Sequence, residues 1–174
     1  MIALDVDGVL NPSGNPAKLN RRGFVRHRDV PAGNGRFDLW LHPGHGERLL
    51  TLAAHLDAEL VWATTWNEHA NAEVAPRVGL PELPVIHVTP PFRWRSRYEH
   101  WKADAVRVWA GYRPLAWLDD ELNAEDERWA WKRGETLLIR CNPQVGLTLP
   151  QLDYVATWGD GGAGPPWREG RDWK

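Results

Sequence analysis

Five short apolar runs, separated by stretches of helical or turn character, constrain the fold more than any other feature of this sequence. They cover residues 2–6, 59–66, 84–88, 114–120 and 136–142. The runs are continuously apolar, which is typical of strands whose sheet is covered on both faces. Strands that alternate with helices favour βαβ units. The pattern therefore predicts an α/β fold, a three-layer sandwich with a mainly parallel central sheet.

The segments between these runs predict the helices and one hairpin. Two alternating stretches around "PAGNG", 24–30 and 36–41, predict a small β-hairpin inserted after the first strand. Residues 11–23 contain turn-forming Pro, Gly and Asn. Apolar residues at helical spacing predict helices within 42–58, 67–79, 101–112 and 148–158, the second of them stopped by Pro76 and Gly79. Residues 121–134 read as a polar helix or a loop.

The length of 174 residues fits one domain, which we expect to span 1–158, followed by a Gly- and Pro-rich tail at 159–174. The net charge of -2 excludes a global electrostatic attraction to nucleic acid, so any basic surface must be local. The single Cys141 excludes an internal disulfide and reads as inert core. The chain shows no signal peptide and no apolar run of membrane-spanning length, so we expect a cytoplasmic protein with no membrane partner.

Polar side chains end three of the predicted strands, and a lysine begins a later helix. In a parallel sheet covered by helices, ligands bind beyond the carboxyl ends of the strands, so these residues are expected to share one site. Carboxylates from two strand ends suit Mg²⁺, which prefers few carboxylates together with water and substrate phosphate. The residues are Asp5 and Asp7, Thr64 and Thr65, Asp119 and Asp120, and Lys102.

Such a set has the groups that phosphoryl transfer requires. A carboxylate such as Asp5 can attack phosphorus, and Asp7, just beyond it, can protonate the leaving oxygen and later deprotonate water. A Thr hydroxyl and a Lys ammonium can hold phosphoryl oxygens as charge develops. Each signal alone has an ordinary explanation, such as a strand meeting solvent, a helix cap or a solvated lysine. Their joint placement at strand ends favours one catalytic site.

These segments resemble the motifs of the haloacid dehalogenase-like (HAD) superfamily. "DVDGVLN" looks like motif I, "LVWATTW" like motif II, the lysine of "EHWKADAV" like motif III, and "LAWLDDEL" like the Asp-Asp form of motif IV. The resemblance covers roughly residues 1–150 and implies a Rossmann-like fold. Within the superfamily, "VWATTW…AN" and "NPQVGLT" resemble the small domain associated with nucleic-acid repair proteins.

The resemblance implies a role for each catalytic residue. Asp5 would be the nucleophile that forms an aspartyl-phosphate, and Asp7 the general acid and base. Thr64 would orient the phosphate, with Thr65 as a possible substitute. Lys102 would stabilise the negative charge of the transferring group.

The resemblance also implies an Mg²⁺ cofactor. Its ligands would be the Asp5 carboxylate, the backbone carbonyl of Asp7 and one acid of motif IV. Asp120 is the preferred acid, and Asp119 remains open. Superfamily members that do not transfer phosphoryl groups often lack an acid at the position of Asp7, so its presence favours phosphatase chemistry.

No stretch of the sequence reads as the cap domain with which many superfamily members select their substrate. The first insertion, 11–46, reads as a hairpin, and the second, 67–101, as one helix, one strand and a loop. A capless site is open and typically serves large substrates such as nucleic-acid ends or phosphoproteins. A small metabolite remains possible if the hairpin or a second subunit closes over the site; the oligomeric state is unknown.

The loop "FRWRSRYEHWK" indicates a nucleic-acid contact. Arg93, Arg95 and Arg97 alternate with other residues just before Lys102, and guanidinium groups fork onto phosphates. Trp94 could stack on a base. The alternative is a solvated loop with Trp94 turned inward.

The sequence therefore predicts an Mg²⁺-dependent phosphomonoesterase, with polynucleotide ends as a candidate substrate. Two alternatives remain, a non-catalytic HAD-fold module that binds nucleic acid and a small-metabolite phosphatase. A phosphoryl mutase is disfavoured by the missing cap. His42 and His45 in "HPGH" lack further metal ligands at suitable spacing, so we do not expect a metal site there.

Overall fold

Four parallel strands form the central sheet of the computed structural model, which describes residues 1–33, 35–88 and 102–162. The strands are β1 (Ile2–Leu4), β4 (Leu60–Trp62), β5 (Leu115–Asp119) and β6 (Thr136–Arg140), in the order β4-β1-β5-β6. β1 is central and pairs with both β4 and β5 in parallel register. Every residue of β1, β4 and β5 is buried, as their continuous apolar character predicts.

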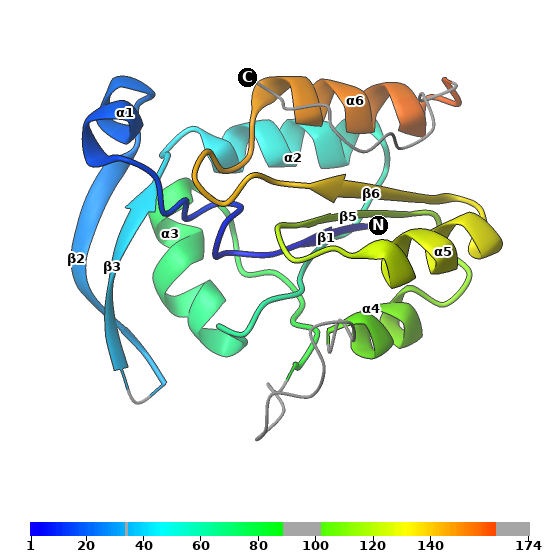
Figure 1. Cartoon of the computed structure of the whole chain (residues 1–174), viewed down its shortest axis with the longest axis horizontal. Helices are drawn as coiled ribbons and strands as arrows, with labels where there is room; N and C mark the ends of the chain where they lie inside the picture. The colour runs from blue at the N-terminus through cyan, green and yellow to red at the C-terminus, as the bar shows by residue number, and fades with distance from the viewer. Residues whose placement is uncertain (34, 89–101, 163–174) are drawn as a thin grey trace.

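Helices cover both faces of this sheet (Figure 1). The helices α2 (His45–His55) and α6 (Leu149–Gly159) lie on one face, and α4 (Ala103–Ala110) and α5 (Ala124–Arg133) on the other. Successive strand residues enter opposite cores, so Ile2 and Leu4 pack with Leu49 of α2, whereas Ala3 packs with Val106 of α4. The predicted three-layer α/β sandwich is therefore confirmed.

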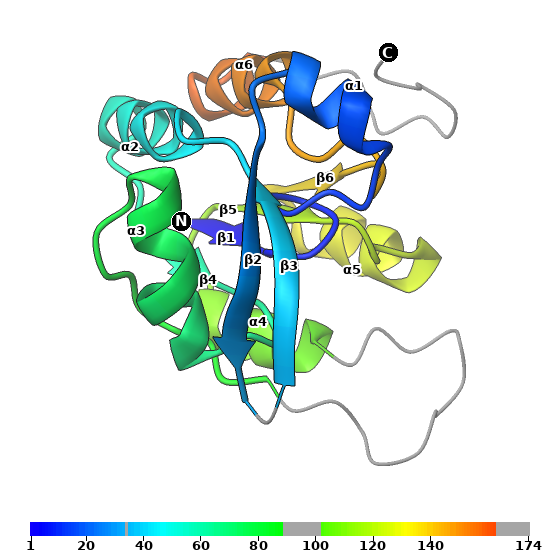
Figure 2. The same cartoon turned by 90° about the vertical axis from the view of Figure 1, so that its left-hand side faces the viewer.

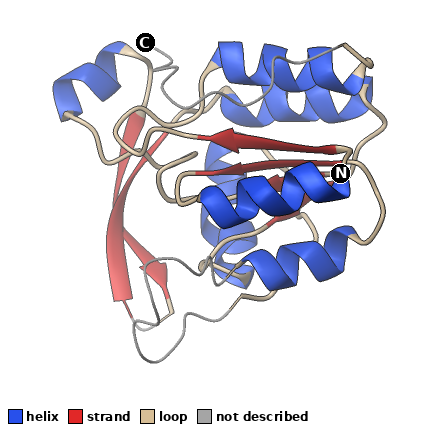
Figure 3. Cartoon of the chain, turned by 45° about the vertical axis from the view of Figure 1, so that its right-hand side comes forward, coloured by secondary structure: helices blue, strands red, loops and turns tan. Residues whose placement is uncertain are grey.

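A separate antiparallel hairpin, β2 (Val25–Ala32) and β3 (Gly35–Leu41), lies beyond the carboxyl ends of the sheet strands (Figures 2 and 3). Two ion pairs cross it, Arg26–Asp38 and Arg36–Asp29. Leu39 of β3 is fully buried, so this face of the hairpin joins the core. The hairpin is confirmed as the insertion after β1, and the described residues contain no cap domain.

Three local predictions were wrong. Residues 84–88 form no strand but a single bridge, from Val85 to Trp62, at the edge of the sheet. Pro76 does not stop the second helix: a π-helical turn (Ala70–Val74, η1) continues into α3 (Ala75–Val78), and only Gly79 ends it. Because Pro76 occupies the first turn of α3, its missing N–H removes no helical hydrogen bond.

The third wrong prediction concerns residues 11–23, where a short helix, α1 (Pro16–Arg21), replaces part of the expected turn. The Asn15 side chain caps it by accepting hydrogen bonds from the N–H groups of Ala17 and Lys18. An Asn cap followed by Pro at the first position is a helix-start signal that the turn-like composition concealed. No helix among the described residues has both the length and the apolar character that a membrane span requires.

Candidate active site

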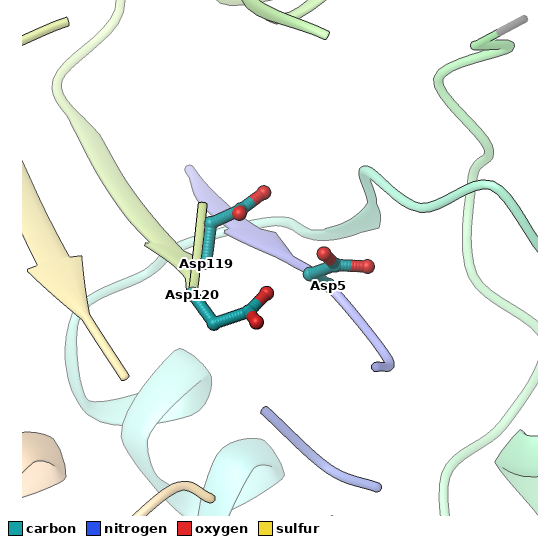
Figure 4. Close-up of side chains that lie close together, drawn as sticks. All are labelled: Asp5, Asp119 and Asp120. Atoms are coloured by element: carbon teal, nitrogen blue, oxygen red, sulfur yellow. The ribbon is translucent and has the colours of Figure 1, made fainter. Parts of the chain in front are cut away.

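Three carboxylates converge where β1 and β5 end side by side. The backbone N–H of Asp5 donates to the Leu118 carbonyl at 3.1 Å, which aligns the end of β1 with the end of β5. One carboxylate oxygen from each of Asp5, Asp119 and Asp120 lies within 4.8 Å of the others. Figure 4 shows the three side chains around a common space. The acids of motifs I and IV, more than a hundred residues apart in sequence, therefore form one cluster.

Gly8 provides the room that Asp120 occupies. Its φ of +71° lies in the left-handed region that side chains rarely adopt, and a Cβ there would lie 2.3 Å from Cγ and Oδ2 of Asp120. The turn after motif I must therefore carry glycine, both for its backbone angle and for the approach of this carboxylate.

Replacing Gly8 by Ala is expected to weaken divalent-cation binding about tenfold or more, because Asp120 must move out of the cluster. Binding of Mg²⁺ measured by calorimetry tests this. The matched control is Gly134→Ala: Gly134 has a similar φ of +66°, but no atom lies within 4 Å of the added Cβ. The control should lose about 1–3 kcal/mol of stability to backbone strain, because φ +66° with ψ -179° is a conformation essentially restricted to glycine. Equal cation affinity in both variants would contradict the steric explanation.

Lys102 lies between the acids. It is the N-cap of α4, and its Nζ pairs with Asp5 and, at 2.8 Å, with Oδ2 of Asp119. The other oxygen of Asp119 accepts the backbone N–H of Glu121 at 2.8 Å. Asp119 therefore directs both of its oxygens to protein groups, whereas Asp120 turns toward the cluster beside Gly8.

Thr64 lies beside the carboxylate of Asp5. It is fully buried after β4, and its hydroxyl lies close enough to the side chain of Asp5 to lower the pKa of that carboxyl. The neighbouring Thr65 is exposed and lines a groove next to the cluster. The structure thus brings Thr64 to the acids and leaves Thr65 at their rim.

The ionisation of the cluster reflects its burial. Desolvation raises the pKa of Asp5 to about 7, helped by the Asp119 carboxylate and opposed by Lys102 and Thr64. Desolvation and Asp119 likewise raise the pKa of Asp120 to about 6. For Lys102, desolvation lowers the pKa, but the two carboxylates beside it outweigh that effect and the net pKa is raised. The lysine stays charged while the acids hold excess negative charge, an environment that favours a cation.

The cluster fits a hard divalent cation. It offers three carboxylate oxygens close together, and two of the acids have raised pKa values that a bound cation would lower. Among the described residues this is the only grouping of His, Cys, Asp or Glu with metal-binding geometry.

The Asp7 side chain lies outside this cluster and is held separately. Its Oδ1 accepts the Asn11 amide at 2.8 Å, and its Oδ2 accepts the indole N–H of Trp66 at 2.9 Å. Asn11 also accepts the backbone N–H of Trp40 in the hairpin at 2.8 Å. Sequence reasoning missed Trp66 and Asn11, although both lie within the segments that resemble motifs I and II.

A groove of about 760 Å³ opens from Asp7 toward the hairpin. Phe37 and Leu39 of β3 line one side, and Thr65 and Trp66 line the other. The rings of Phe37 and Trp66 meet at 6.0 Å between centroids. This groove could not be predicted from sequence, because its walls come from the hairpin and from the segment after β4, which only folding brings together.

The loop residues Arg93, Trp94, Arg95 and Arg97, which we predicted to bind substrate, lie outside the described residues. A family described as "HAD domain in Swiss Army Knife RNA repair proteins" matches residues 1–152. The chain belongs to this family. No curated protein and no solved structure matches the chain. The predicted HAD resemblance is thereby confirmed, including its association with nucleic-acid repair.

Other candidate residues of this HAD domain lie away from the acids. The His42 and His45 rings stack at 5.0 Å, and burial lowers the pKa of His45 to about 3, which keeps it neutral. The two histidines pack against Phe24, and they form no metal grouping among the described residues. Burial raises the pKa of the Cys141 thiol, so this cysteine is unreactive core, as predicted.

Proposed function

We propose that this HAD domain is a divalent-metal-dependent phosphomonoesterase that acts on phosphorylated nucleic-acid ends. The observation that carries the proposal is the convergence of Asp5, Asp119, Asp120 and Lys102 at the carboxyl edge of the sheet, beside an acid that faces an open groove. That combination supplies a nucleophile, a cation site, a fixed ammonium and a separate proton donor.

In this proposal Asp5 attacks phosphorus and the bond from phosphorus to the leaving oxygen breaks. Asp7 gives its proton to that oxygen, so the leaving group departs as a neutral alcohol. Asp7 then takes a proton from water, whose oxygen attacks the phosphorus of the aspartyl-phosphate and regenerates Asp5. The position of Asp7 beside the groove supports the assignment, because a leaving group held there would bring its oxygen to this carboxyl.

Asp5 and Asp7 have different polar partners, which suit them to different roles in the proposed reaction. Lys102 and Thr64 hold Asp5 in the buried cluster, where they would also neutralise charge on the phosphoryl group. Asn11 and Trp66 hold Asp7 apart from the cation site, so its proton can reach the leaving oxygen. Trp66 is in this respect a positioning residue.

Asp5 and Asp120 would hold Mg²⁺, with the backbone carbonyl of Asp7 as a further ligand. Asp119 would contribute mainly by orienting Lys102, since both of its oxygens contact protein groups. When bound, the cation would neutralise charge on the phosphoryl oxygens and so make the phosphorus more susceptible to attack.

The substrate class rests on two observations. The description of the family to which the chain belongs names RNA repair proteins. In addition, the residues that the structure describes include no cap domain over the site. An uncapped site is accessible to the end of a polymer. The basic loop 92–102 would add phosphate contacts if it lies beside this edge.

The test is a phosphate-release assay on metal-free protein. The substrates are RNA oligonucleotides phosphorylated at the 3′ or the 5′ end, ribose 5-phosphate, a phosphopeptide and an aryl phosphate. We expect release from an oligonucleotide end at a kcat/KM at least about tenfold above the others, dependent on added Mg²⁺ and abolished by chelator.

Each of the other outcomes would contradict part of the proposed function. Undiminished turnover in excess chelator would contradict the metal assignment. A preference for ribose 5-phosphate would favour the small-metabolite phosphatase. Oligonucleotide binding without turnover of any substrate would favour a non-catalytic binding module.

A further inference from the structure

The groove beside Asp7 adjoins the candidate active site. Asp7 lines it directly and is tied to Trp66, which forms part of its wall. Its volume of about 760 Å³ lies within the range of about 300–1,000 Å³ for sites that hold small molecules. A leaving group that takes its proton from Asp7 can extend into this space, because Asp7 lines it.

An aromatic ring on the hairpin faces the groove. Phe37 occupies the same face of β3 as Leu39 and Leu41, which are fully buried, because alternate strand residues point the same way. At Phe37, however, the core ends and half of the residue remains exposed (51%). A large apolar side chain left open on the inner face of a strand, at the wall of a groove, is a surface suited to a planar ligand.

The two rings restrict how such a ligand binds. Phe37 and Trp66 are tilted by 60° with their centroids 6.0 Å apart, so they contact each other and leave no parallel slot between them. A planar ligand would therefore have to stack on Phe37 itself and not between the two rings. Trp66 supports Phe37 from the side while its indole N–H holds Asp7.

The charge of the groove limits the ligand further. Its described lining includes the acids Asp7, Asp38 and Glu68 but no Lys or Arg. Arg26 pairs with Asp38, and His87 lies 3.4 Å from Glu68. A run of several phosphates would be repelled here, whereas one neutral nucleoside would not.

We propose that this groove binds the terminal nucleoside that carries the scissile phosphate, with its base stacked on Phe37. The inference rests on the proposed function and adds that the enzyme reads the last base of its substrate through Phe37. The phosphate then lies over Asp5, the leaving oxygen at Asp7 and the base against the hairpin, while the rest of the chain leaves the groove. The hairpin thus acts as a base platform.

The kinetic test compares phosphorylated RNA oligonucleotides that end in a normal nucleotide with matched ones whose terminal residue lacks a base. We expect the protein to favour the base-containing end by about tenfold in kcat/KM, mainly through KM, which is the effect of one stacked base. Phe37→Ala should reduce this preference to about twofold or less, and Phe37→Tyr, which keeps the ring, should restore it. Phe37→Ala and Phe37→Tyr should have the same kcat/KM as each other on the abasic end, because no base is present there to stack on the ring.

The control variant is Tyr112→Ala. Tyr112 is a fully exposed aromatic residue in the turn between α4 and β5, at the opposite edge of the sheet. The Tyr112→Ala variant should keep the full preference for the end that carries a base. Turnover of both ends at equal rates by the unmodified protein would overturn the base platform while leaving the phosphatase intact.

A binding measurement keeps the two proposals separate. The fluorescence of 2-aminopurine riboside 3′-monophosphate should be quenched on binding, because its base stacks on a ring, and Phe37→Ala should remove most of that quenching. Quenching that depends on Phe37 without any turnover would support the base platform and reject the phosphatase. Quenching that is unchanged in Phe37→Ala would overturn the platform.

Discussion

Replacing Asp5 by Asn is expected to abolish phosphatase turnover, with a loss of roughly 10⁴-fold or more. The amide keeps the shape of the side chain but cannot attack phosphorus, so no aspartyl-phosphate forms. The measurement is steady-state phosphate release, together with mass spectrometry of protein quenched during turnover. The unmodified protein should show the mass of one added phosphoryl group, and the variant none.

The matched control is Asp104→Asn. Asp104 lies in the first turn of α4, close in sequence to Lys102, but its side chain is 96% exposed and pairs with Arg107 at 3.6 Å. This variant should retain turnover within about twofold, since exposed pairs of this kind contribute little. If Asp5→Asn retained the turnover of the unmodified protein, the covalent mechanism would be wrong.

Replacing Lys102 by Met is expected to lower the free energy of unfolding by about 3–5 kcal/mol at about pH 8. The side chain is buried, and its loss leaves the carboxylates of Asp5 and Asp119 without their shared cation. Lys132→Met, which changes an exposed lysine on α5, should cost far less and serves as the control. Urea denaturation of both variants gives the comparison.

The pH dependence of this loss identifies its cause. Removing Lys102 takes away an influence that lowers the pKa of Asp5, so its pKa in the folded protein rises further above the unfolded value. A raised carboxyl pKa leaves stability intact below the unfolded value and reduces it as pH rises through the folded value. The variant should therefore approach the stability of the unmodified protein at about pH 4 and fall away toward about pH 8.

Added Mg²⁺ should recover part of that loss at about pH 8, because a cation between the acids replaces some of the missing charge. A loss of the same size at both pH values, unaffected by Mg²⁺, would mean that Lys102 stabilises the fold through the packing of its methylene groups alone.

The local sequence pattern was enough to predict the layers of this protein and most of the acidic residues of its candidate active site. Continuous apolar runs specify buried parallel strands, and the acids that follow them must lie at one edge of the sheet, so Asp5, Asp119 and Asp120 could be grouped in advance. The hairpin followed from its own alternation. The edge of the sheet was less predictable, because an apolar pattern does not reveal how far strand pairing extends. Residues 84–88 are apolar enough for a strand, yet only Val85 forms a bridge, to Trp62.

Only the tertiary structure decided which groups meet. The order β4-β1-β5 puts Asp5 beside Asp119 and brings Lys102, 97 residues away in sequence, against both. The indole N–H of Trp66 holds Asp7, a contact that depends on the path of the chain after β4 and on no periodicity. Phe37 has the sequence signature of a core residue on the inner face of β3. It becomes a groove wall because the hairpin extends past the end of the sheet, where no further layer of the described residues covers the ring.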